Sequence, residues 1–119
     1  MKPEKSRAMT DAEIRRLETL EKRYRNAARQ QFESRVAYFH RITGGNYTSV
    51  TVRDQKTRWG SCSSRGTLSF NYRLIFAPPA VLDYVVVHEL CHLSHMDHSK
   101  NFWNMVASVM HEYGEYRKW

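Results

Sequence analysis

The sequence contains few cysteines: Cys62 and Cys91 are the only two among its 119 residues. Two cysteines cannot form the disulfide framework that holds a small secreted domain together. Cys62 lies in a polar stretch, and Cys91 lies inside a histidine-rich stretch. The cysteine usage therefore gives no sign of an oxidising compartment.

A long uninterrupted apolar segment is also missing. The longest apolar stretch, residues 74–87, is broken by Pro78, Pro79 and Asp83, whereas a membrane-spanning helix needs about 20 apolar residues. The basic first residues lead into no apolar segment of the kind found in a signal peptide. We therefore expect no membrane segment and a cytoplasmic location. Internal repeats and low-complexity segments are absent as well.

The positive charge is unevenly distributed. The net charge is +7, and residues 1–60 account for all of it, with 14 lysines and arginines against 7 acidic residues. In residues 61–119 the two signs balance, five against five. A basic first half indicates either weak contact with an anionic partner such as nucleic acid or, more simply, a solvated helix face. The length favours one domain, over residues 10–119, preceded by a flexible tail over residues 1–9.

Four of the six histidines lie between His88 and His98, and the segment His88-Glu89-Leu90-Cys91-His92 matches the H-E-x-x-H pattern of zinc hydrolases. On a helix, positions i and i+4 differ by about 40° around the axis, so His88 and His92 present their rings side by side. Glu89 points about 100° away from His88, close to a metal without binding it. That is the position of a general base acting on water.

The third metal ligand is less clear, because His95 and His98 compete for the role. On an unbroken helix, His88, His92 and His95 would approach a metal from one side, whereas tetrahedral zinc requires spread ligands and one open position. Ser99 is a good N-cap for a new helix, so we expect the chain to leave the first helix near His95. This favours His98 as the ligand, with His95 behind it or facing the substrate.

The remaining sequence predicts a small α+β domain. Thr10 and Glu13 form a capping box that begins a long helix, which ends at the glycine pair 44–45. Its apolar residues recur every three or four positions and predict one stripe packed on a sheet. The members of this stripe are Ile14, Leu17, Leu20, Tyr24, Ala28, Phe32, Val36 and Phe39.

Two strands and two further helices follow the long helix. Residues 47–53 and 67–70 read as strands, which we expect to be antiparallel, with residues 56–66 as the loop between them. Pro79 favours the start of a helix over about 79–95, which carries the metal motif, and Ser99 the start of the last helix.

The sequence resembles the YgjP-like metal-dependent hydrolase family, the minimal zincins related to SprT-like and WLM proteases. The resemblance covers roughly residues 21–119 and is densest in three places. These are the R-W-G-S-C motif at residues 58–62, the segment Asn71-Tyr72-Arg73-Leu74 with 77–79, and residues 84–103 around the histidines. It implies a zincin-like fold, with one zinc ion per chain held by His88, His92 and His98, and Glu89 as the catalytic base.

The function implied is that of a zinc metallopeptidase acting on a peptide or protein. In zincins an edge strand commonly receives the substrate, and residues 67–70 are the expected edge. The candidates for contacting the substrate or the transition state are Arg58, Tyr72, His95 and Tyr113.

Two alternatives remain open. One is a nucleoside triphosphate pyrophosphatase, in which Arg58, Arg65 and Arg73 would bind phosphate, although no glycine-rich phosphate loop is present. The other is a DNA-associated, SprT-like protease module that docks through its basic first helix.

Overall fold

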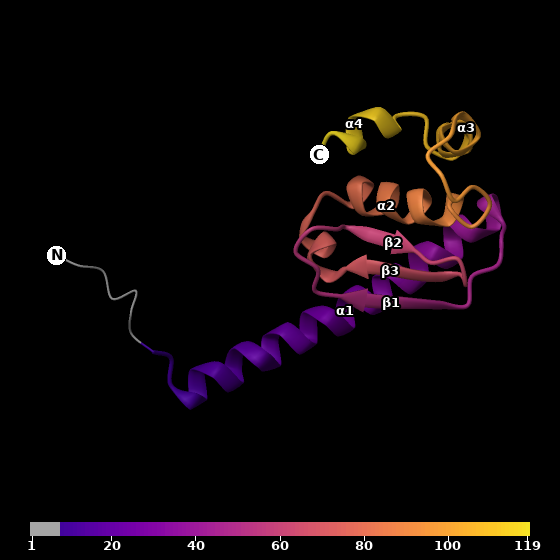
Figure 1. Cartoon of the computed structure of the whole chain (residues 1–119). Coiled ribbons are helices and arrows are strands. Elements are labelled where there is room, and N and C mark those ends of the chain that lie inside the picture. The colour runs from indigo at the N-terminus through magenta and orange to yellow at the C-terminus, as the bar shows by residue number, and fades with distance from the viewer. Residues whose placement is uncertain (1–7) are drawn as a thin grey trace.

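The computed structural model describes residues 8–119 as four α-helices, a short 3₁₀-helix and three strands (Figure 1). Most of the predicted tail, residues 1–7, lies outside the described residues. In chain order the elements are α1 (Asp11–Thr43), β1 (Ser49–Arg53), β2 (Gly60–Cys62), β3 (Thr67–Asn71), η1 (Tyr72–Phe76), α2 (Pro79–Cys91), α3 (Lys100–Val109) and α4 (Tyr113–Arg117). The predicted α+β class with a long N-terminal helix is confirmed.

Helix α1 begins as predicted, at a capping box. The Thr10 hydroxyl accepts a hydrogen bond from the Glu13 backbone N–H, and the Glu13 carboxylate accepts one from the Thr10 N–H, both at 3.1 Å. The helix ends at Gly44, whose φ of 68° suits glycine.

The prediction that the whole apolar stripe of α1 is buried is wrong for its first half. Phe32 and Val36 are fully buried, but Ile14 and Leu17 remain 38% and 50% exposed. The reason is length: 33 residues make a helix of about 50 Å, longer than the body on which it packs. Figure 1 shows its N-terminal half projecting from the rest of the protein, and the molecule measures 56 × 31 × 22 Å.

The sheet has the strand order β1-β3-β2 and is mixed. β1 and β3 pair in parallel, with Val50 opposite Leu68 and Val52 opposite Phe70, so the predicted antiparallel pairing of these two strands is wrong. β2 lies within the predicted loop and forms the antiparallel hairpin with β3. Its sequence, Gly-Ser-Cys, has no β-branched or aromatic residue that would have indicated a strand. β3 is consequently the central strand, and β2 occupies an edge.

One face of this sheet packs on helices α1 and α2. Leu68 and Phe70 of β3 are buried there, and the Phe32 ring of α1 stacks on Phe70 with centroids 4.5 Å apart. Arg35 of α1 makes a two-pronged ion pair with Asp83 of α2, at 2.7 and 2.9 Å. The two helices are thereby held side by side, and α2 packs against the sheet face that carries the core.

Helix α2 lies in the middle of the molecule, between the sheet and helices α3 and α4 (Figure 1). It begins at Pro79 as predicted but ends at Cys91, before the predicted residue 95. Nine of its thirteen residues are buried, as expected of a helix covered on several sides. Within residues 8–119 no helix is both long enough and apolar enough to cross a membrane.

Replacing Phe32 by alanine should lower the free energy of unfolding by about 3–5 kcal/mol, because it removes a fully buried ring and leaves a cavity. Replacing Leu17 in the projecting half should change it by less than about 0.5 kcal/mol. Urea unfolding of both variants measures the difference. Similar losses from the two substitutions would mean that Leu17 is covered in solution.

Candidate metal centre

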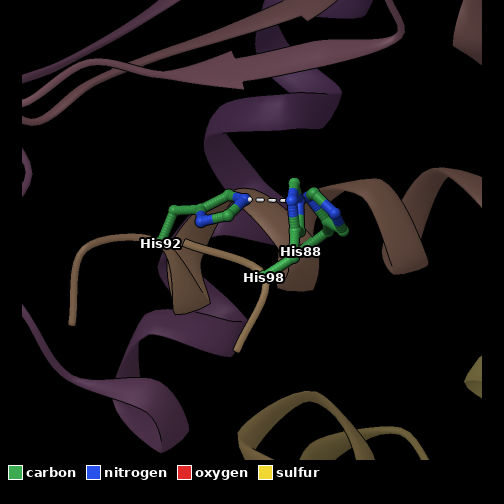
Figure 2. Close-up of side chains that lie close together, drawn as sticks. All are labelled: His88, His92 and His98. Atoms are coloured by element: carbon green, nitrogen blue, oxygen red, sulfur yellow. Dashed lines mark hydrogen bonds between the residues drawn. The ribbon is translucent and has the colours of Figure 1, made fainter. Parts of the chain in front are cut away.

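Three histidines converge beside the end of helix α2. His88 lies in its last turn, His92 is its C-terminal cap, and His98 lies in the segment that leads to α3. One ring nitrogen from each residue lies within 4.8 Å of the other two. Figure 2 shows the rings of His92 and His98 facing each other, with His88 beside them, and the two Nε2 atoms are 3.2 Å apart.

The chain returns His98 to His92 by a turn directly after the helix. The N–H of His95 bonds to the Cys91 carbonyl at 3.0 Å, which closes the last helical turn. Ser99 then begins α3 as its N-cap, accepting a hydrogen bond from Phe102. The predicted break near His95 and the predicted cap at Ser99 are therefore present.

The hydrogen bonds of His92 and His88 select the nitrogen that is free to bind a metal. His92 Nδ1 lies 2.8 Å from the His95 carbonyl oxygen. A carbonyl can only accept, so His92 donates through Nδ1 and keeps its Nε2 lone pair directed at His98. His88 Nδ1 lies 3.0 Å from Glu89 Oε2, which likewise leaves Nε2 of His88 free. His95 thus contributes its backbone carbonyl rather than its ring.

This donor set fits a divalent metal such as zinc. Two nitrogens bound at about 2.0–2.1 Å in a tetrahedral arrangement would lie about 3.3 Å apart, close to the 3.2 Å between His92 and His98. The pKa of His98 is lowered, mainly by loss of contact with water and to a smaller extent by the nearby His92 and His88. A lower pKa favours the neutral ring, which is the form that metals bind. Within residues 8–119 no fourth histidine, cysteine or acidic group joins these three. One coordination position would therefore remain open.

Cys62 borders the same hollow but is not part of this cluster. Burial, and to a smaller extent the charge of Glu89, raise its pKa to about 11, so it is a neutral thiol at physiological pH. Metals bind the thiolate form of cysteine. Cys62 is therefore a neutral thiol in the metal-free protein, and among residues 8–119 the cluster of candidate ligands consists of the three histidines.

Two aromatic side chains of helix α3 pack on the histidine rings. The buried Phe102 stacks on His92 with centroids 4.3 Å apart, and Trp103 stacks on His98 at 5.7 Å. Because both aromatic residues stand in the first turn of α3, the cap at Ser99 determines where they lie. The rings are therefore oriented by packing as well as by hydrogen bonds.

Glu89 is 5% exposed and faces the same hollow, of about 230 Å³, as the three histidines. Gly60 of β2 lies directly against it: a Cβ at this position would be 3.1 Å from both Cγ and Oε2 of Glu89. Gly60 was not among the predicted site residues. A glycine inside a strand is a recognised sign that another group approaches closely.

The other predicted contact residues differ in their distance from the hollow. Arg58 borders it directly. Tyr72 is buried in the core, between the guanidinium groups of Arg25 and Arg73, and does not border it. Tyr113 stacks on Trp103 at 5.4 Å, and Trp103 in turn stacks on His98. Their predicted roles remain predictions.

Only one of the three arginines proposed for phosphate binding borders the histidines. Arg58 does so, while Arg73 is ion-paired with Asp54 and Arg65 lines none of the hollows near the site. The predicted trio of Arg58, Arg65 and Arg73 is therefore not assembled at this centre.

Comparison with known proteins places these features in context. The sequence profile of the family described as "YgjP-like, metallopeptidase domain" matches residues 3–119. Among curated proteins no match was found. The fold is similar to the metallopeptidase zymogen of Pyrococcus abyssi abylysin, with a TM-score of 0.66 and 24% identity over 73% of this chain and 89% of that one.

A second similar structure is the metallopeptidase zymogen of Methanocaldococcus jannaschii jannalysin. The TM-score is 0.63 at 20% identity, over 73% of this chain and 90% of that one. At these identities the two likenesses show the fold alone.

We expect His98→Ala to lower zinc affinity by more than about 100-fold, because it removes a proposed ligand. Loss of a group that only hydrogen-bonds to a ligand typically costs about 10- to 100-fold. His95→Ala should bind zinc within about threefold of the unmodified protein, since the carbonyl that orients His92 belongs to the backbone. Competition with a chelating dye measures both affinities. Equal loss of zinc in the two variants would instead point to His95 as a ligand.

Proposed function

Because this chain belongs to the YgjP-like metallopeptidase family, we propose that it is a zinc-dependent peptidase with Glu89 as its general base. The observation that carries the proposal is the convergence of three histidine rings and one buried carboxylate on a single hollow. His88, His92 and His98 would hold the ion. When bound, zinc supplies a Lewis acid that lowers the pKa of water and polarises the substrate carbonyl.

Glu89 is placed to move the proton. Its carboxylate is shielded from bulk water but borders the hollow in which a peptide bond would lie next to the histidines. The carboxylate accepts a proton from the attacking water and passes it to the leaving amine. The contact with His88 and the packing against Gly60 hold its side chain in place for both transfers.

The substrate strand would pair with β2 rather than with β3. Residues 67–70 were the predicted receiving edge, but β3 is central and both of its sides are already paired. β2 has one free side, and all three of its residues, Gly60–Cys62, line the metal hollow. An extended peptide added at this edge would bring its backbone past the histidines.

Arg58 is the predicted contact residue best placed to assist the reaction. It borders the hollow together with His88 and Glu89, and it brings a positively charged group with several N–H donors. It would stabilise the negative charge that develops on the carbonyl oxygen during attack.

Glu89→Gln should abolish most peptide hydrolysis, lowering kcat by about 10²–10⁴-fold, because the amide cannot accept the proton. Zinc content should stay at the level of the unmodified protein, since Glu89 is not a ligand. Hydrolysis of unfolded casein, measured alongside metal analysis, tests both statements. A zinc-loaded Glu89→Gln variant with full activity would remove Glu89 from the mechanism.

Gly60→Ala should lower kcat by roughly 10-fold, because the new Cβ requires Glu89 or Val85 to give way slightly, and a misplacement of about 1 Å can cost about 10²-fold in rate. Gly114→Ala is the matched control, since nothing lies within 4 Å of a Cβ at that position. Casein hydrolysis of the two variants gives the comparison. Equal activity would show that the contact at Gly60 is unimportant for the reaction.

A further inference from the structure

A second hollow, of about 240 Å³, adjoins the metal hollow. Arg58, Gly60, His88 and Glu89 border both, so a group bound in the second hollow lies next to the peptide bond under attack. Its volume is below the 300–1,000 Å³ typical of sites for whole small molecules and suits a single amino-acid residue. The remaining lining residues are Trp59, Tyr84, Val85 and Arg117.

Two arginines line this hollow and come from segments far apart in sequence. Arg58 precedes β2, and Arg117 is the last residue of α4. Within residues 8–119 neither forms an ion pair with an acidic side chain, in contrast to Arg25, Arg35 and Arg73. Two unpaired positive charges at one small concave site favour an anionic ligand.

The other walls of the hollow suit a carboxylate on a short apolar stem. Val85 and the half-exposed Trp59 supply apolar surface. Tyr84 also lines the hollow, and a tyrosine hydroxyl can donate a hydrogen bond. Glu89 is the one acidic residue in the lining, and its Oε2 is already engaged by His88.

Arg117 is held over this site by stacking. Its guanidinium lies 4.4 Å from the centroid of the Trp103 ring, the same ring that packs on His98. A guanidinium that lies flat on an aromatic ring still has its N–H groups available, at the edge of its own plane, to bind a second partner. The position of Arg117 is thereby tied to the metal centre through a single indole ring.

We propose that Arg117 binds a carboxylate on the substrate residue next to the cleaved bond, in a subsite that Arg58 borders on the side of the metal hollow. This inference rests on the proposed peptidase function. An aspartate or glutamate side chain and the free C-terminus of a peptide offer the same carboxylate chemistry. Arginine binds either one through paired, charge-assisted hydrogen bonds.

The test begins with the cleavage sites of zinc-loaded protein in unfolded casein, identified by mass spectrometry. Peptides spanning one site are then made with glutamate, glutamine or leucine on either side of the cleaved bond. A further pair ends one residue after the bond, with a free or an amidated C-terminus. The measured quantity is kcat/KM for each peptide.

We expect glutamate to exceed glutamine by at least about 10-fold at one position, or the free C-terminus to exceed the amide by a similar factor. Whichever pair shows the preference identifies the source of the carboxylate. Arg117→Gln should bring the ratio close to one, and Arg117→Lys should retain part of it because the charge remains. Lys118→Gln is the matched control, because its side chain does not line the hollow, and it should keep the full ratio.

The outcomes separate the inference from the function on which it rests. Cleavage with ratios near one, or a ratio that survives in Arg117→Gln, overturns the carboxylate subsite and leaves the peptidase function in place. No cleavage of casein by zinc-loaded protein overturns the peptidase function, and the subsite inference falls with it. Because each readout is a ratio within one variant, a general loss of stability in Arg117→Gln does not imitate the predicted effect.

Discussion

The proposed metal centre depends on one constraint: two histidines a helical turn apart can contact a metal from only one side. A third ligand would have to come from another direction, and His98 is available because α2 ends at Cys91 and the chain folds back within seven residues. The hydrogen bond from His92 Nδ1 to the His95 carbonyl connects this turn directly to the ring of His92. The same bond orients the His92 ring and holds the turn that leads to His98. A change that breaks it should therefore disturb both histidines.

The position of the Glu89 carboxylate, the proposed general base, depends on a different part of the fold. Helix α2 determines only the direction in which Glu89 leaves the backbone, whereas the glycine of β2 determines how closely the sheet can approach it. The short edge strand therefore has two effects. It closes one wall around Glu89 and leaves a free edge beside the histidines, and both effects follow from the pairing of β2 with β3.

Features that depend on local sequence were predictable, and features that depend on pairing between segments were not. The capping box at Thr10, the cap at Ser99 and the helix start at Pro79 each arise from neighbouring residues. The pairing of β1 with β3 was mispredicted because β2 has weak strand propensity and its role appears only in the assembled sheet. The apolar stripe of α1 was assigned correctly to one face, but periodicity alone does not say how far along a helix its partner extends.

Electrostatics at the site illustrates the same limit. Residues 61–119 carry no net charge, so the sequence predicted that the excess positive charge lies in the first half of the chain. In the folded protein, Asp83 is bound to Arg35 and Asp54 to Arg73, which removes two acidic groups from competition for other cations. Arg58 and Arg117, one from each half, remain unpaired with acidic side chains of residues 8–119 and meet beside Glu89. The local charge of a binding site is therefore determined by which ion pairs form elsewhere, and net charge along the sequence does not reveal it.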